Sequence, residues 1–101
     1  MNQLEVITLE EFKANSRIEG SEEDAVLERL AMAAESMVFR AIRRPWYEVE
    51  SAYGGIPPEV RQAVLMVADH LYANRGETSG VQQYRLPLGV RDMLSPFIKL
   101  F

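Results

Sequence analysis

The residues that could carry chemistry in this sequence are few. His70 is the only histidine, and it directly follows Asp69 in a segment predicted to be helical. Neighbouring side chains on a helix point about 100° apart, so this pair is poorly placed to activate a nucleophile. The sequence has no cysteine, which excludes thiolate nucleophiles, iron–sulfur clusters, disulfides and cysteine-ligated zinc. We therefore expect no catalytic residues.

The acidic pairs are explained by helix starts rather than by acid–base catalysis. Glu10–Glu11 and Glu22–Glu23 fall in first turns of predicted helices, where the helix dipole favours negative charge. Gly54–Gly55 lacks the lysine and the serine or threonine of a phosphate-binding loop. One histidine without cysteine leaves carboxylates as metal ligands, and no calcium-loop spacing is present. The sequence predicts no cofactor, no metal site and no enzyme.

The charge balance argues against strong binding to nucleic acid. The formal net charge is −4, which repels a phosphate backbone unless the basic residues gather on one face. One basic cluster exists, formed by Arg40, Arg43 and Arg44 at the end of a predicted helix. These cations either complement the helix dipole or contact phosphate.

Length and composition predict a single folded domain over residues 1–101. The 101 residues are 48% hydrophobic and 26% charged, which is ordinary globular usage. We find no signal peptide and no apolar run approaching the length of a membrane span. A soluble cytoplasmic product without membrane contact is expected.

The pattern of capping residues and prolines predicts an all-α fold. Thr8, three residues before Glu11, predicts a helix from Leu9 to about Asn15. Ser21 precedes three acids and predicts the N-cap of the longest helix. That helix is expected to continue to about Arg44, because the next residue is a proline.

The long helix has an unusually broad apolar face. Two adjacent stripes recur at three- and four-residue spacing: Val26, Leu30, Ala33, Met37 and Ala41, and Leu27, Ala31, Ala34 and Val38. Such a helix is either central in its own domain or shared with a neighbouring subunit.

Residues 45–55 are predicted to form an irregular loop or a short hairpin arm, because aromatics, acids and two glycines are mixed there. Trp46, Tyr47 and Tyr53 in this segment serve either as packing residues or as interface anchors.

Two further helices are predicted after this segment. Pro57–Pro58 opens a helix over about Glu59 to Arg75, which Gly76 closes, and its apolar face should pack against the long helix. A mobile surface loop is expected over 76–83, and a short helix over Val90–Leu94. The result is a compact bundle of about four helices, of which one is long and central.

The C-terminal tail, residues 95–101, is apolar and contains Phe97 and Phe101. Chain ends without a role are usually polar and frayed, so this tail is expected to dock. Its site is either the chain's own groove or the surface of a partner.

Three blocks of the sequence, in order, resemble the head-tail connector (adaptor) family of tailed bacteriophages. The features are Leu9 to Lys13, Arg17-Ile18 followed by acids and the long helix, Pro58 with Gln62-Ala63, Leu71-Tyr72 with Asn74-Arg75, and Leu86-Pro87 with Gly89-Val90. The order and spacing of these blocks carry the resemblance. One departure is Arg43 to Trp46, which stands where the family usually closes the long helix with glycine.

The resemblance implies a structural virion protein of the head-tail junction, made in the bacterial cytoplasm. It implies a ring of about a dozen copies below the portal, which joins the head to tail or stopper proteins. DNA would pass through this ring without sequence-specific binding. Trp46, Tyr47, Phe97 and Phe101 are the expected protein-interface residues.

The alternative is a small helical regulatory or interaction module that binds nucleic acid through Arg40, Arg43 and Arg44. Salt-dependent binding to short duplex DNA would favour the module. Ring formation without DNA affinity would favour the connector.

Overall fold

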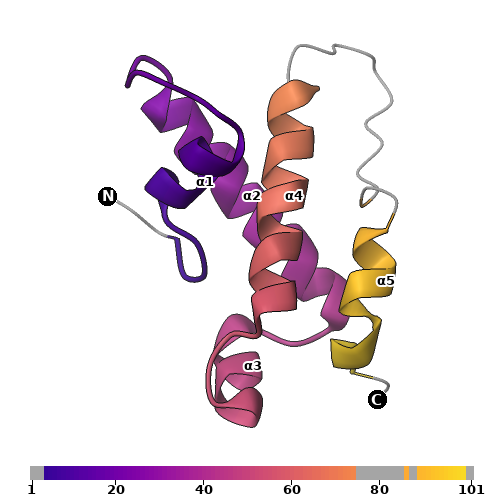
Figure 1. Ribbon diagram of the computed structural model, residues 1–101. Coiled ribbons are helices and arrows are strands. Elements are labelled where there is room, and N and C mark those ends of the chain that lie inside the picture. Colours follow the sequence, from indigo (N-terminus) through magenta and orange to yellow (C-terminus); the bar gives the residue numbers. More distant parts are fainter. Residues whose placement is uncertain (1–3, 75–85, 87–88, 100–101) are drawn as a thin grey trace.

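The computed structural model describes residues 4–74, 86 and 89–99, and the fold in these residues is all-helical, as predicted. The helices are α1 (Leu9–Asn15), α2 (Asp24–Ile42), α3 (Trp46–Tyr53), α4 (Pro58–Ala73) and α5 (Val90–Leu94), with a 3₁₀ turn at Ser95–Phe97. Helix α4 lies between α1 and α5, α2 crosses behind it, and α3 sits at one end (Figure 1). The described part thus has five α-helices rather than the predicted four.

Helix α1 has the predicted bounds, and its start is set by a reciprocal cap. The hydroxyl of Thr8 accepts a hydrogen bond from the backbone N–H of Glu11 at 3.1 Å. The carboxylate of Glu11 accepts the backbone N–H of Thr8 at 2.8 Å. Two N–H groups without helical partners are therefore satisfied by two side chains three positions apart.

The predicted bounds of the long helix are wrong at both ends. Ser21 does not cap it: residues 21–24 form a turn in which the Ser21 carbonyl accepts the Asp24 N–H at 3.3 Å. Helix α2 starts at Asp24, after this turn has used the residues expected in its first turn. It ends at Ile42 because Arg43 adopts a left-handed conformation, φ 62° and ψ 32°. The helix is about 28 Å long at 1.5 Å per residue.

Arg43 occupies the position at which helices usually place a glycine, which accounts for the departure noted at this point of the sequence. This left-handed conformation costs a residue with a Cβ atom about 1–2 kcal/mol, and glycine avoids that cost. The unfolded chain is more flexible with glycine, which cancels part of the stabilisation. We expect Arg43→Gly to raise the free energy of unfolding by about 0.5–1 kcal/mol, measured by urea denaturation. The control Arg40→Gly, inside α2, should instead lower it by about 1 kcal/mol.

The predicted loop or hairpin arm at residues 45–55 is wrong, because Trp46–Tyr53 form helix α3. Pro45 precedes the helix in an extended conformation, and Gly54 ends it at φ 72°. Proline before the first turn and glycine after the last are ordinary helix boundaries. The two glycines therefore mark the end of a helix rather than a loop.

Helix α4 starts at Pro58, one residue before the predicted start, and ends at Ala73 with Asn74 as its cap. The predicted end at Arg75, the closing Gly76 and the loop 76–83 lie outside the described residues. Helix α5 has the predicted bounds. No helix in the part of the chain that the structure describes is long and apolar enough to cross a membrane.

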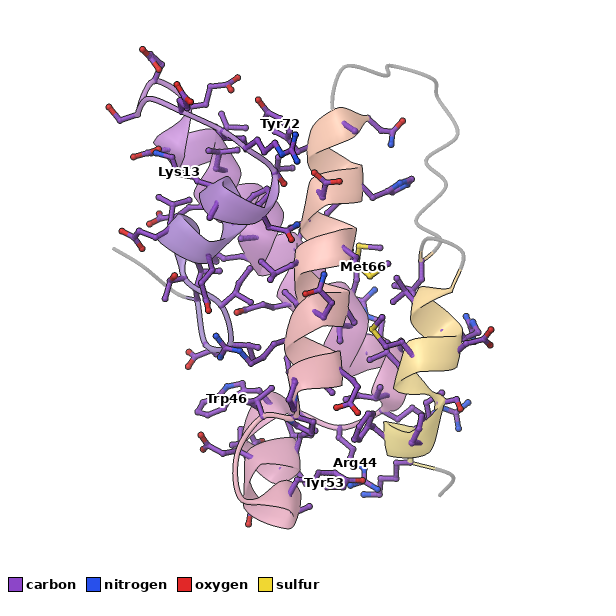
Figure 2. The ribbon with its side chains drawn as sticks, viewed as in Figure 1. Lys13, Arg44, Trp46, Tyr53, Met66 and Tyr72 are labelled. Atoms are coloured by element: carbon purple, nitrogen blue, oxygen red, sulfur yellow. The ribbon has the colours of Figure 1, made fainter. Side chains whose placement is uncertain are left out.

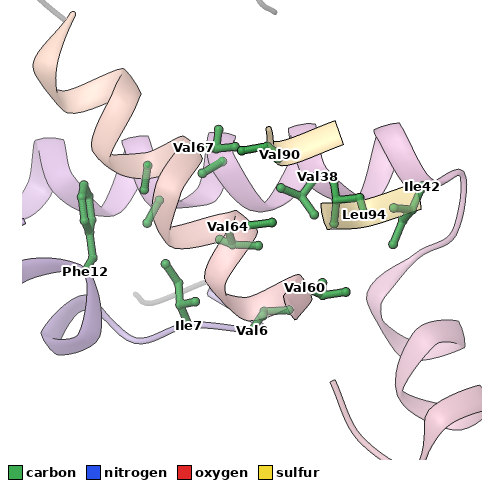
Figure 3. Close-up of a cluster of buried hydrophobic side chains, with 14 of the residues drawn as sticks. Val6, Ile7, Phe12, Val38, Ile42, Val60, Val64, Val67, Val90 and Leu94 are labelled. Carbon is green, nitrogen blue, oxygen red and sulfur yellow. The ribbon is translucent and has the colours of Figure 1, made fainter. Parts of the chain in front are cut away.

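The core lies between α2 and α4 and extends to α1, α3 and α5 (Figure 3). One predicted apolar stripe of α2 is buried there: Leu27, Ala31, Ala34 and Val38. The other stripe is only partly covered, and its Ala33 is exposed. Within the described residues, the broad apolar face is therefore divided between the core and a partly exposed surface.

Two oppositely charged side chains, one from α2 and one from α4, hold the segment that precedes α1. The buried carboxylate of Glu35, on α2, accepts the backbone N–H groups of Glu5 at 3.1 Å, Val6 at 2.7 Å and Ile7 at 3.0 Å. From α4, Arg61 donates to the Val6 carbonyl at 2.8 Å and pairs with Glu11. The apolar side chains of Val6 and Ile7 are thereby fixed in the core.

Candidate interaction surface

Trp46 and Tyr47, two of the predicted interface residues, lie at the start of α3 and differ in exposure. Trp46 is partly buried against the core, near Met32 and Phe39 in a small pocket. Tyr47 is 62% exposed and touches Trp46 edge-on, with ring centroids 5.8 Å apart. Of the two, Tyr47 is the more exposed side chain, and its ring rests against Trp46.

Phe97 is buried in the chain's own core, with 8% of its surface exposed. Its ring meets Tyr53 of α3 edge-on, at a centroid distance of 5.3 Å. The backbone N–H of Lys99 donates to the Ile42 carbonyl at 2.9 Å, so the described part of the tail docks on its own subunit. Phe101, the fourth predicted interface residue, lies outside the described residues.

Helix α3 protrudes from the molecule at the end where α2 finishes (Figures 1 and 2). Val49 is its one buried residue. Tyr47, Glu50 and Tyr53 are exposed, so much of the helix surface faces solvent. An eight-residue helix with this little core contact presents a convex surface carrying aromatic rings and acids.

An open groove of about 760 Å³ lies along the partly exposed stripe of α2. We call it the α2 groove, and its lining combines small and apolar side chains with two arginines: Ala33, Ser36, Met37, Arg40, Ala41, Leu71, Leu86 and Arg91. Pockets of this size with an apolar floor and few polar groups are typical binding sites. The sequence predicted the stripe but not the groove, because Leu71, Leu86 and Arg91 reach it only through the fold.

The three arginines of the predicted basic cluster have separate surroundings. Arg40 lines the α2 groove, and Arg43 occupies the left-handed turn. Arg44 is partly buried, and its Nε has no hydrogen-bond partner within the described residues. This separation does not favour the cluster as one continuous phosphate-binding face.

The described residues form a small all-helical protein with one exposed aromatic helix and one open groove. In the described residues no three carboxylate, histidine or cysteine side chains group to hold a metal. The family described as "Phage gp6-like head-tail connector protein" matches residues 6–97. The chain belongs to this family, which confirms the resemblance seen in the sequence. It is therefore a structural virion protein that joins the phage head to the tail.

Comparison with curated proteins gave no match, and comparison with solved structures gave none either.

Proposed function

We propose that this chain forms a closed ring of about a dozen copies below the portal, through which DNA passes between head and tail. The observation that carries this proposal is the family match over residues 6–97. The partners are other copies of the chain, the portal protein and a tail or stopper protein. The proposed site of action is the head-tail junction of the virion, and the chain itself is made in the bacterial cytoplasm.

The charge of the chain supports a passive role towards DNA. Each subunit carries a formal net charge of −4, so a ring of these subunits makes few attractive contacts with phosphate and DNA would slide through it. The partly exposed stripe of α2 and the protruding α3 supply different contact surfaces on one subunit, as a ring requires.

The proposal is tested by mixing the purified chain with purified portal and examining the product by electron microscopy. A ring seated on one face of the portal is the expected result. In parallel, fluorescence anisotropy with a short duplex should show no binding at physiological salt. Absence of any portal complex, together with tight and salt-dependent DNA binding, would contradict the connector role and favour a nucleic-acid-binding module.

A further inference from the structure

The α2 groove has a floor shaped to receive a helix. Along α2 it extends from Ala33 to Ala41, about 12 Å at 1.5 Å per residue. Ala33, Ser36 and Ala41 are small, so a second backbone can approach closely. Leu71 of α4 and Leu86 supply apolar contacts beside this floor.

The groove also carries positive charge. Arg40 of α2 and Arg91 of α5 both line it, and both are exposed. Neither has an ion-pair partner among the residues that the structure describes. An occupant that carries carboxylates beside an apolar or aromatic surface would complement both features of this groove.

Helix α3 has the matching properties. It has eight residues and a length of about 12 Å. Tyr47 and Glu50 lie three residues apart, so they share one exposed face. Glu50 has no ion-pair partner in the described part of the chain, and α3 contains no basic residue.

A subunit cannot place α3 in its own groove. The helix is joined to the end of α2 by Arg43 to Pro45 alone, and Val49 holds it in the core at that end of the molecule (Figure 1). The occupant must therefore come from another copy. A contact between two different patches on identical subunits is heterologous; such contacts close into a ring when the rotation between neighbouring copies closes, and otherwise build an open filament.

We infer that α3 of one copy docks in the α2 groove of the next, with Tyr47 against the apolar floor and Glu50 facing Arg40 and Arg91. This inference rests on the proposed ring and names the surfaces that build it. It assigns an interface role to Tyr47 and adds the groove as its counterpart.

Charge reversal tests the contact. Glu50→Arg and Arg40→Glu should each raise the concentration at half-assembly by about ten-fold, because like charges then face each other. Combining both changes in one chain should restore assembly to within about three-fold of the unaltered chain. Glu19→Arg, the same charge change at an exposed position outside α3 and the groove, is the control and should have little effect.

Cross-linking provides a second test that uses the absence of natural cysteine. A chain with Tyr47→Cys and Ala33→Cys should give a ladder of covalent oligomers on oxidation, since both positions are exposed and would meet across each contact. A chain with Tyr47→Cys and Glu19→Cys is the control and should not form the ladder. Circular dichroism verifies that each variant keeps its helices.

The outcomes separate the two proposals. If rings form but the Tyr47–Ala33 pair cross-links no more than the control, the docking of α3 is overturned and the ring stands. If charge reversal at Glu50 acts like the change at Glu19, the docking is likewise overturned. If the unaltered chain forms no ring in solution or on the portal, the proposed function itself fails.

Discussion

Replacement of Glu35 by alanine is expected to lower the free energy of unfolding by about 3–5 kcal/mol. Glu35 is 6% exposed, and its carboxylate accepts backbone N–H groups from Glu5, Val6 and Ile7. Alanine removes every one of these acceptor contacts and leaves buried donors unsatisfied, at a cost of about 1–3 kcal/mol each. Urea denaturation followed by circular dichroism measures the change.

Two variants make the Glu35 result specific. Glu28→Ala changes the same residue type on the same helix, at a half-buried position that has no hydrogen-bond or ion-pair partner among the described residues. It should lower the free energy of unfolding by less than about 0.5 kcal/mol. Glu35→Gln keeps one oxygen acceptor but loses the charge, so its effect should fall between the two. Equal stability of the Glu35→Ala and Glu28→Ala chains would show that Glu35 does not hold the segment before α1.

Phe12→Ala is expected to lower the free energy of unfolding by about 3–5 kcal/mol. Phe12 is the buried residue of α1, is fully inaccessible, and meets Tyr72 of α4 edge-on with ring centroids 6.4 Å apart. Its removal leaves a cavity between α1 and α4. The ion pairs of α1, Lys13–Asp24 and Glu11–Arg61, are too exposed to compensate.

Phe12→Leu is the control for cavity size. Leucine keeps most of the buried volume, so the loss should be about 1–1.5 kcal/mol. A similar, small loss for both variants, read from urea midpoints, would show that α1 is not anchored through this ring.

The sequence was sufficient to predict those helices whose ends are set by contacts between residues close together in the chain. The reciprocal cap of Thr8 and Glu11 spans four residues, so α1 could be placed from sequence. Helix α3 was missed because its aromatic and acidic residues show no clear apolar stripe. Pro45 and Gly54, with eight residues between them, were the available signal for a short helix.

Long-range contacts account for what the sequence could not predict. Glu35 bonds to N–H groups 28–30 residues away, and nothing local distinguishes it from the other acids. Tyr47 and Phe97 are both aromatic residues near a predicted break, yet one is exposed and the other is buried by Tyr53. The arginines of the α2 groove come from positions 40 and 91, and the packing of α5 against α4 brings them to one surface.

The burial of Phe97 changes how assembly must be tested. Removing the last five residues deletes Phe97, which is a core side chain. A loss of rings after that truncation would not distinguish unfolding of the subunit from the loss of a contact between subunits. Surface variants at Tyr47 or Glu50 avoid this difficulty because both side chains are exposed.

The central claim is that this family member assembles into a ring, and the most direct measurement is the molar mass of the purified full chain by light scattering over a wide concentration range. The account predicts a single large species of about a dozen subunits. This species forms in solution, or it forms on added portal at concentrations where the chain alone is monomeric. A mass equal to one subunit at every concentration, unchanged by portal, would contradict it.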